Sequence, residues 1–251
     1  GVLEAIGPHA LTGAGTKETS PITFAGGTLR YGTDATTDAA NPAPVTTDWS
    51  AQVAGSTGPV SVDTDGKDVY VAQAFGDKTG ASGRLVKTGA GALTLTGAQT
   101  VSVVVVEEGT LAVAAQAEDW TSSLVLRPGT SLTLAGTPSL LKLGGLVATN
   151  ATLVLDPKDA VEVGGTLELV DVKIEFTSAP ALNDADELFT CQGEVSAATA
   201  RTIRRAIAKL ATADGTHAIA EMTTDPGTGK THIKVHVKED LGPIGPEGTT
   251  T

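Results

Sequence analysis

The feature that most constrains the fold is a short phrase that recurs along the chain. It consists of a turn at Gly or Asn, then a small residue, then a run in which apolar and polar residues alternate. The last five copies begin 15 to 21 residues apart, which is about the length of one coil of a β-solenoid. The copies are GGTLRYG from Gly26, GALTLTG from Gly91, GTLAVAA from Gly109, GTSLTLAG from Gly129, NATLVLD from Asn150 and GTLELVD from Gly165.

The alternation predicts short strands with one buried face. A single strand of this length cannot bury that face alone, whereas stacked coils cover one another and satisfy their backbones by parallel pairing. The sequence therefore predicts an all-β fold, a parallel β-solenoid of the right-handed β-helix type. An antiparallel β-sandwich built from the same strands is the alternative.

The pattern and composition of the sequence divide the chain into three parts. Residues 1–177 are predicted to form the solenoid, with an irregular N-terminal part and a loop at 33–59 that is rich in Thr, Asp, Ala and Pro. Residues 178–239 are predicted to form a small α/β cap. Residues 240–251 carry Gly, Pro and Thr without a core pattern, which indicates a tail or linker.

The predicted cap contains one helix, at 196–211. Ser196 can cap its N-terminus, and Ile203, Ile207 and Leu210 recur at helical spacing. The strings HAIAEMTTD and THIKVHVK flank a Pro-Gly turn and predict a closing β-hairpin. Such a cap would cover the apolar end that the last coil of a solenoid leaves exposed.

Composition excludes several classes of function. The chain has 17 Lys and Arg against 29 Asp and Glu, a formal charge of −12, which disfavours a nucleic-acid partner. No apolar run approaches the ~18 residues of a membrane span, so no membrane insertion by this segment is expected. Cys191 is the only cysteine, which excludes an intramolecular disulfide and predicts a small buried side chain.

The string GRLVKTGAGALTLTGAQTVSVVVVEEGTLAVAA, residues 83–115, resembles the autotransporter-associated β-strand repeat of large bacterial surface proteins. The resemblance implies a passenger-like β-helix that is secreted or displayed on the cell surface, without catalytic residues. One departure is that residues 101–106 continue as an apolar run where the family places an aromatic residue and a glycine pair. The matching residues are Leu85, Lys87, Thr88, Gly89, Gly91, Leu93, Leu95, Gly97, Thr100, Val103, Gly109, Thr110 and Leu111.

The string VSVDTDGKDVYVAQ, which precedes this repeat, predicts a β-hairpin that turns at Asp65-Gly66. Asp63, Asp65 and Asp68 in the same string have the spacing of a calcium-binding loop. A complete loop needs a bidentate Glu at its twelfth position, which is Ala74 here. A solvated turn is therefore the leading interpretation, and a weak calcium site is the alternative.

For three other patterns, a structural role is the leading interpretation and a binding role is the alternative. The string DPGTGKT, residues 225–231, ends like a phosphate-binding loop but precedes a strand instead of a helix, which favours a hairpin turn. His232 and His236 would lie about 13 Å apart on an extended strand, too far to chelate one metal ion. A basic helix face could meet an acidic partner or the chain's own acidic coils; its residues are Arg201, Arg204, Arg205 and Lys209.

The leading functional hypothesis is a non-catalytic extracellular structural or adhesive module, a stalk or a self-assembling surface fibre that needs no cofactor. Its partners would be further copies, joined through solenoid ends or by strand exchange of the terminal segments, or a host or matrix ligand. One alternative is a carbohydrate-active β-helix enzyme with paired carboxylates, although Trp49 and Trp120 offer little surface for sugar stacking; the candidate carboxylates are Asp156, Asp159 and Glu162. The other alternative is a calcium-dependent binding module.

Overall fold

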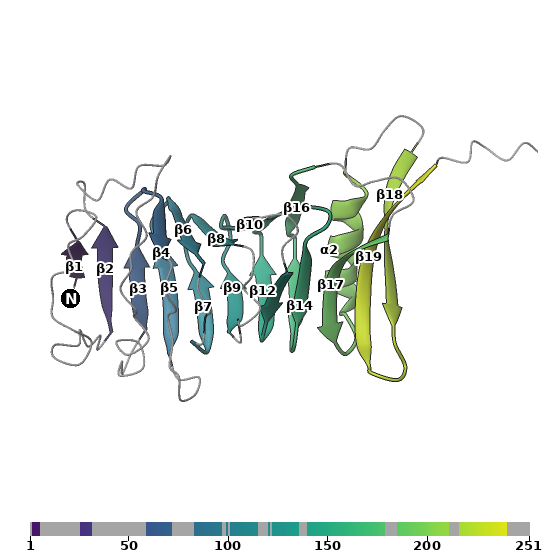
Figure 1. The fold of residues 1–251 in the computed structure, drawn as a ribbon, viewed down its shortest axis with the longest axis horizontal. Helices are drawn as coiled ribbons and strands as arrows, with labels where there is room; N and C mark the ends of the chain where they lie inside the picture. The colour runs from purple at the N-terminus through teal and green to yellow at the C-terminus, as the bar shows by residue number, and fades with distance from the viewer. Residues whose placement is uncertain are drawn as a thin grey trace, which may run out of the picture.

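The computed structural model describes residues 2–5, 26–31, 59–71, 83–96, 99, 101–114, 120, 122–135, 140–178, 185–210 and 216–239. Their strands stack in sequence order along the long axis of the molecule, as Figure 1 shows. The predicted parallel β-solenoid with one helix near its C-terminal end is confirmed. The predicted loop at 33–59, except for Pro59, and the predicted tail at 240–251 lie outside the described residues.

The strands form three sheets, which we call sheets 1, 2 and 3. Sheet 1 has eight parallel strands in the order β1 (Val2–Ala5), β2 (Gly27–Tyr31), β3 (Val60–Asp63), β5 (Arg84–Thr88), β7 (Val103–Val106), β9 (Ser123–Leu126), β12 (Gly145–Thr149) and β15 (Leu167–Val170). Sheet 2 has six parallel strands in the order β4 (Val69–Val71), β6 (Ala92–Leu95), β8 (Thr110–Ala114), β10 (Ser131–Ala135), β13 (Thr152–Leu155) and β16 (Lys173–Phe176).

Sheet 3 begins later in the chain and ends differently. It has five strands in the order β11 (Leu140–Leu143), β14 (Ala160–Val163), β17 (Ala185–Gln192), β19 (Lys230–Glu239) and β18 (Thr216–Thr224). The first three strands pair in parallel, whereas β17–β19 and β18–β19 are antiparallel. The predicted closing hairpin is therefore β18 and β19, and it extends the third wall of the solenoid.

The core consists of rows of side chains that stack from coil to coil. In sheet 2, parallel pairing aligns one buried residue from each of five successive strands, and none of the five is more than 5% exposed. Complete burial of such a side chain contributes about 1.5–3 kcal/mol. Each coil therefore depends on its neighbours for most of its stability. The row is Leu93, Leu111, Leu132, Leu153 and Ile174.

The phrase that begins at Gly165 does not occupy the place that its spacing suggests. The phrases from Gly91, Gly109, Gly129 and Asn150 supply successive strands of sheet 2, but the fifth supplies β15 in sheet 1. The next strand of sheet 2 is β16, in which Lys173 aligns with Thr152. The sequence KIEF of β16 has no glycine turn before it, because the chain turns there at Asp171 with a φ of 50°.

The predicted β-hairpin at VSVDTDGKDVYVAQ is wrong. The two strands, β3 and β4, belong to different sheets, where β3 pairs with β2 and β5, and β4 pairs with β6. Asp65 and Gly66 both have positive φ, and the Lys67 amide donates to the Thr64 carbonyl at 2.9 Å. The same turn chemistry that closes a hairpin here makes a corner of the solenoid, because each strand finds a better partner in the neighbouring coil.

Glycines allow these corners to stack closely. A Cβ on Gly91 would lie 2.5 Å from the carbonyl carbon of Lys67 in the preceding coil. Gly109 has a φ of +72°, and a Cβ there would lie 2.5 Å from the carbonyl oxygens of Gly89 and Gly91. Gly91 and Gly109 are therefore required because backbone packs on backbone at this corner.

Helix α2 (Ala197–Ile207) confirms the helix that was predicted at 196–211, although it ends earlier. Ser196 is its N-cap, and the Ser196 hydroxyl accepts from the Thr199 amide at 3.2 Å. Ile203 and Ile207 are fully buried, whereas Leu210, beyond the end of the helix, is only partly buried. In the described part of the chain, no helix has the length and hydrophobicity needed to cross a membrane.

We predict that Gly91→Ala lowers the free energy of unfolding by about 1–3 kcal/mol, the usual cost of overpacking. The added methyl group would force the two corners apart, and urea denaturation would measure the change in midpoint. Gly164→Ala is the matched control, since a Cβ there meets nothing closer than 3.6 Å; a change within about 0.5 kcal/mol is expected. Equal losses in both variants would contradict backbone packing at the Gly91 corner.

Candidate functional site

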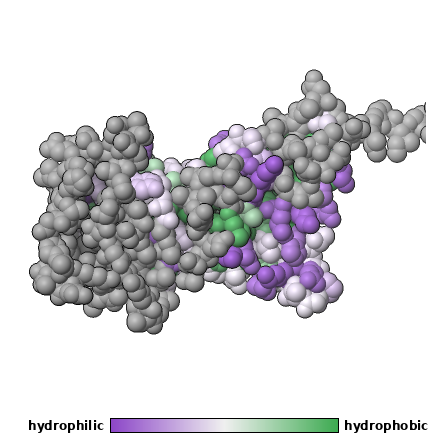
Figure 2. Space-filling model, viewed as in Figure 1, coloured by the Kyte–Doolittle hydropathy of each residue, from purple (hydrophilic) through white to green (hydrophobic). Residues whose placement is uncertain are grey.

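The C-terminal end of the solenoid carries many polar and charged side chains (Figure 2). Figure 2 shows hydrophilic residues concentrated over the part of the molecule that contains α2, β18 and β19. At this end each of the three sheets has a last strand of the stack, and each strand needs a partner for its free backbone groups. The three sheet edges differ in which element, if any, covers them.

The edge of sheet 1 is closed by helix α2. The Thr199 hydroxyl accepts from the Leu169 amide of β15 at 3.0 Å, and Thr199 is fully buried. The Ser196 hydroxyl lies 3.1 Å from the same Thr199 oxygen. A side chain of the helix thus satisfies a backbone donor that the next coil would otherwise satisfy. The edge of sheet 3 is closed by β19 and β18, which continue the sheet.

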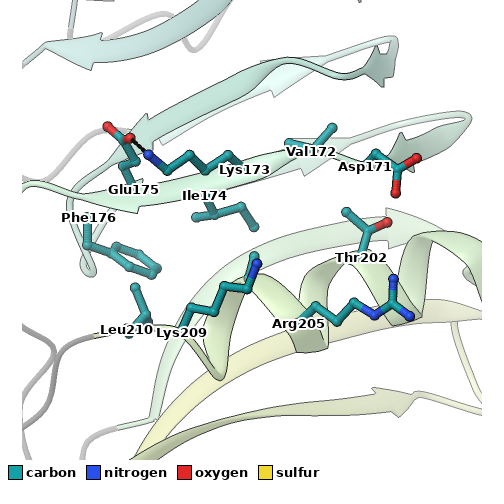
Figure 3. A pocket seen from close by; sticks show the side chains of 11 residues that line it. Asp171, Val172, Lys173, Ile174, Glu175, Phe176, Thr202, Arg205, Lys209 and Leu210 are labelled. Atoms are coloured by element: carbon teal, nitrogen blue, oxygen red, sulfur yellow. Dashed lines mark ion pairs between the residues drawn. The ribbon is translucent and has the colours of Figure 1, made fainter.

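Among the described residues, the edge of sheet 2 has neither kind of closure. No described strand pairs with the outer edge of β16, and a groove of about 700 Å³ separates this edge from α2. Figure 3 shows that Ile174 and Phe176 point from β16 toward Leu210 and the helix. Val172 and Ala206 complete the apolar part of the lining.

Of the charged residues that line this groove, those on β16 are paired with each other, whereas those on the helix have no ion-pair partner among the described residues. Lys173 and Glu175 of β16 form an ion pair with each other, drawn as the dashed line in Figure 3. Arg205 and Lys209 line the groove from the helix side and are exposed. Within the part of the chain that the structure describes, neither makes an ion pair with a carboxylate. As far as the described residues show, the groove therefore offers a strand edge without a partner strand, an apolar wall and two cations without a carboxylate partner.

The other two cations of the predicted basic face, Arg201 and Arg204, are also exposed, and they do not line the groove. Among the described residues they make no ion pair either. The helix thus carries two separate pairs of cations, one in the groove and one outside it. Within the described ranges, no ion pair joins either pair of cations to the chain's own acidic coils.

The calcium candidates Asp63, Asp65 and Asp68 lie at the corner between β3 and β4, each with its own partner. Asp63 accepts from Arg30 at 2.9 Å and from the Asp65 amide at 2.9 Å, and Asp68 accepts from the Ala92 amide at 3.0 Å. Lys67 donates to the Asp65 carboxylate at 2.9 Å, and this bond holds the pKa of Asp65 below its usual value. The described residues contain no group of three or more His, Cys, Asp or Glu arranged to hold a metal ion.

The family-motif residues divide between the core and this corner. Leu85, Leu93, Leu95 and Leu111 are fully buried in the core, and Gly97 and Thr100 lie outside the described residues. The remainder lie in or beside the turns between sheets 1 and 2, where Thr110 pairs with Ala92 and Val103 with Arg84. Lys87 is the exception and belongs to the interior.

Lys87 occupies an apolar row of sheet 1 between Val62 and Val106 and is fully buried. Its ammonium group donates to the Thr64 hydroxyl at 3.1 Å, to the Thr88 carbonyl at 3.0 Å and to the Gly89 carbonyl. Burial lowers the pKa of Lys87 to about 8, although nearby carboxylates, Asp63 first, favour the charged form. A lysine in the motif thus joins the core row to the carbonyl groups of the glycine corner.

The carboxylates considered for glycoside chemistry serve structural contacts. Asp156 accepts from the Lys158 amide at 3.0 Å and from the Ser178 hydroxyl at 3.0 Å, and Asp159 is fully buried and accepts from the Asp156 amide at 2.6 Å. Glu162 binds Lys230 of the hairpin at 3.1 Å. Trp120 is buried, so it presents no surface for sugar stacking, and Trp49 lies outside the described residues.

The imidazoles of His232 and His236 each meet a different carboxylate. His232 contacts Glu187 of β17, while His236 Nε2 lies 2.8 Å from Glu221 Oε2 of β18 without hydrogen-bond geometry. Burial raises the pKa of Glu187, but hydrogen bonds from His232 and Thr190 outweigh it and hold the pKa below its usual range. The two histidines therefore link strands of sheet 3.

The string at 225–231 forms the turn between β18 and β19, as predicted. Asp225 accepts from the Gly227 amide and the Thr228 hydroxyl, both at 2.8 Å, and these bonds lower the pKa of Asp225. Lys230 and Thr231 already belong to β19, so no helix N-terminus faces this loop. Cys191 is buried, and burial raises the pKa of its thiol.

The groove itself was not predicted from the sequence. Arg205 and Lys209 were recognised as basic, but Ile174, Phe176 and Leu210 form a site only because β16 is the last strand of sheet 2. The one signal in the sequence is that KIEF is followed by no further copy of the phrase that begins with a Gly or Asn turn.

We predict that the free energy of unfolding rises between pH 8 and pH 10 more steeply in the wild type than in Lys87→Met. In this range the unfolded chain keeps its lysine protonated while the folded chain releases that proton, so Lys87 adds up to about 1.4 kcal/mol per pH unit. Tyr31, whose pKa burial raises to about 12, and Cys191 act in the opposite direction in both proteins. Chemical denaturation at each pH measures the difference.

Lys158→Met, at an exposed position, is the control for that experiment and should keep the wild-type slope. Identical slopes in the wild type and Lys87→Met would show that the Lys87 ammonium is not desolvated in the folded state.

We predict that Thr199→Val lowers the free energy of unfolding by about 1–3 kcal/mol, because the Leu169 amide is left buried without an acceptor. Thr202→Val on the same helix is the matched control, since Thr202 is only half-buried and makes no such bond in the described structure. Thermal or urea unfolding of both variants measures the difference, and equal stabilities would contradict closure of the sheet 1 edge by Thr199.

The comparisons with known proteins leave the family open. No family model matches the chain, and no curated protein or solved structure matches it either. The resemblance of residues 83–115 to the autotransporter-associated β-strand repeat therefore stays a prediction.

Proposed function

We propose that the chain is a non-catalytic structural or adhesive module of a bacterial surface protein, exported from the cell and acting there as a rigid spacer. The observation that carries this proposal is the uninterrupted register of parallel strands along sheets 1 and 2. Each coil is held to the next by backbone hydrogen bonds and buried rows, an arrangement that resists bending and stretching. The proposal requires no cofactor.

The chemistry of the described side chains supports this role. The carboxylates at Asp63, Asp156 and Asp159 satisfy backbone or side-chain donors of the turns. The net charge of −12 favours solubility and keeps copies apart. The resemblance at residues 83–115 provides the reason for placing the module at the cell surface.

The covered C-terminal end favours a spacer over a subunit of a fibre. Helix α2 and the β18–β19 hairpin lie where another coil would stack, so they block continuation of sheets 1 and 3. Terminal repeats with a polar outer face have this effect in solenoid proteins generally. Copies should therefore remain separate unless the cap is displaced.

We predict that the purified chain is monomeric and forms single rods, as measured by size-exclusion light scattering and negative-stain electron microscopy. Replacement of the two buried anchors of the helix, Ile203→Asp with Ile207→Asp, should release α2 and convert the rods into end-to-end oligomers. The exposed pair Arg201→Asp with Arg204→Asp introduces the same two aspartates on the same helix without removing a buried anchor, and it should stay monomeric.

Circular dichroism would establish that both variants keep their strands. Ordered filaments of the wild-type protein would contradict the spacer role and make the chain a fibre subunit. Immunogold labelling of intact cells tests the location separately, and label confined to permeabilised cells would contradict display at the surface.

A further inference from the structure

The open edge of β16 has backbone groups in position to accept another strand. The amides of Lys173 and Thr177 donate to the carbonyl groups of Ala151 and Leu155 in the preceding coil, both at 2.9 Å. Residues of a parallel strand alternate in the neighbour to which they hydrogen-bond. The N–H and C=O groups of Ile174 and Phe176 therefore face the groove, where no described strand pairs with them.

We propose that the groove between β16 and α2 binds an extended segment of a partner protein that carries acidic residues at alternate positions. The segment would add to sheet 2 as a further strand, as peptides do at exposed sheet edges in other proteins. This binding follows from the groove alone and does not depend on a surface location of the chain.

The charge and spacing of two helix side chains favour a bound segment with acidic residues at alternate positions. Arg205 and Lys209 are four residues apart on α2, a rise of about 6 Å along the helix axis. Alternate residues of an extended segment are about 6.6 Å apart and point to the same side. Two carboxylates separated by one residue can therefore each meet one cation. Lys173 is already paired with Glu175, so it does not compete for them.

The apolar wall of the groove favours apolar residues between the two carboxylates of the bound segment. Ile174 is buried, whereas Phe176 and Leu210 are only partly buried and border the groove. Apolar side chains of the bound segment would cover these two residues and contribute about 25 cal/mol for each Å² removed from water. The backbone supplies binding to any extended chain, and the cations and the wall supply selectivity for an acidic, alternating one.

The test uses fluorescence anisotropy with the intact chain and two labelled peptides. The acidic probe is Thr-Val-Glu-Val-Glu-Val-Thr, and the basic probe replaces both Glu residues with Lys. We expect the acidic probe to bind at least tenfold more tightly. Arg205→Glu with Lys209→Glu should weaken its binding at least tenfold, whereas Arg201→Glu with Arg204→Glu makes the same change in charge outside the groove and should leave the affinity within about twofold of the wild type.

Two further acidic probes test strand addition directly. Each carries N-methyl groups on one of the two alternating sets of amides, so only one of them keeps the amides that face β16. One methylated probe should bind like the parent, and the other should lose binding at least tenfold. Equal behaviour of the two would overturn strand addition.

Other outcomes would overturn the groove as the site. These are the absence of binding to the intact protein, equal affinity for the acidic and basic probes, and equal losses in the two charge-reversal variants. Unfolding curves of both variants, compared with the wild type, show whether each remains folded during the measurement.

Discussion

Everything in this structure depends on the parallel stacking of coils in register. Inward side chains of one strand are buried only by the same positions of the strands above and below, as in the row from Leu93 to Ile174. Such a stack is stable in its middle and unsatisfied at its ends. The helix, the antiparallel hairpin and the groove are three different consequences of this one requirement at the C-terminal end.

The sequence carried enough information for the stack but not for its corners. Alternating residues and glycine turns at intervals of 15 to 21 residues predicted parallel coils, because few other folds use that combination. The turn at Asp65-Gly66 was misread as a hairpin since the same positive φ values close a hairpin or turn a corner. Only the pairing of β3 with β2 and β5 distinguishes the two. The helix and closing hairpin were predictable from their local patterns.

The groove depends on topology, which the local sequence does not encode. The basic residues of α2 were visible at helical spacing, but whether they faced solvent, an acidic coil or a cavity depended on where the helix lay. Ile174 and Phe176 look like any other strand residues until β16 is known to be the last of its sheet. Conversely, the aspartates that drew attention in the sequence turned out to hold turns together, the commonest use of Asp at such positions.

In a stack of similar coils, a strand can pair with the wrong neighbour, and Lys87 makes one such error unfavourable. The buried leucine and valine side chains are similar from one coil to the next, so a strand that paired with the wrong coil in the same register would still bury them. Lys87 differs, because its ammonium meets the Thr64 hydroxyl of the preceding coil only when β5 pairs with β3 as it does here. In any other pairing the ammonium would keep the Thr88 and Gly89 carbonyl groups of its own coil but would lose the Thr64 hydroxyl, and a hydrogen bond to a charged group is worth about 1.5–3 kcal/mol. One polar residue in the core thus favours the observed pairing of β5 with β3 over other pairings of the same coils.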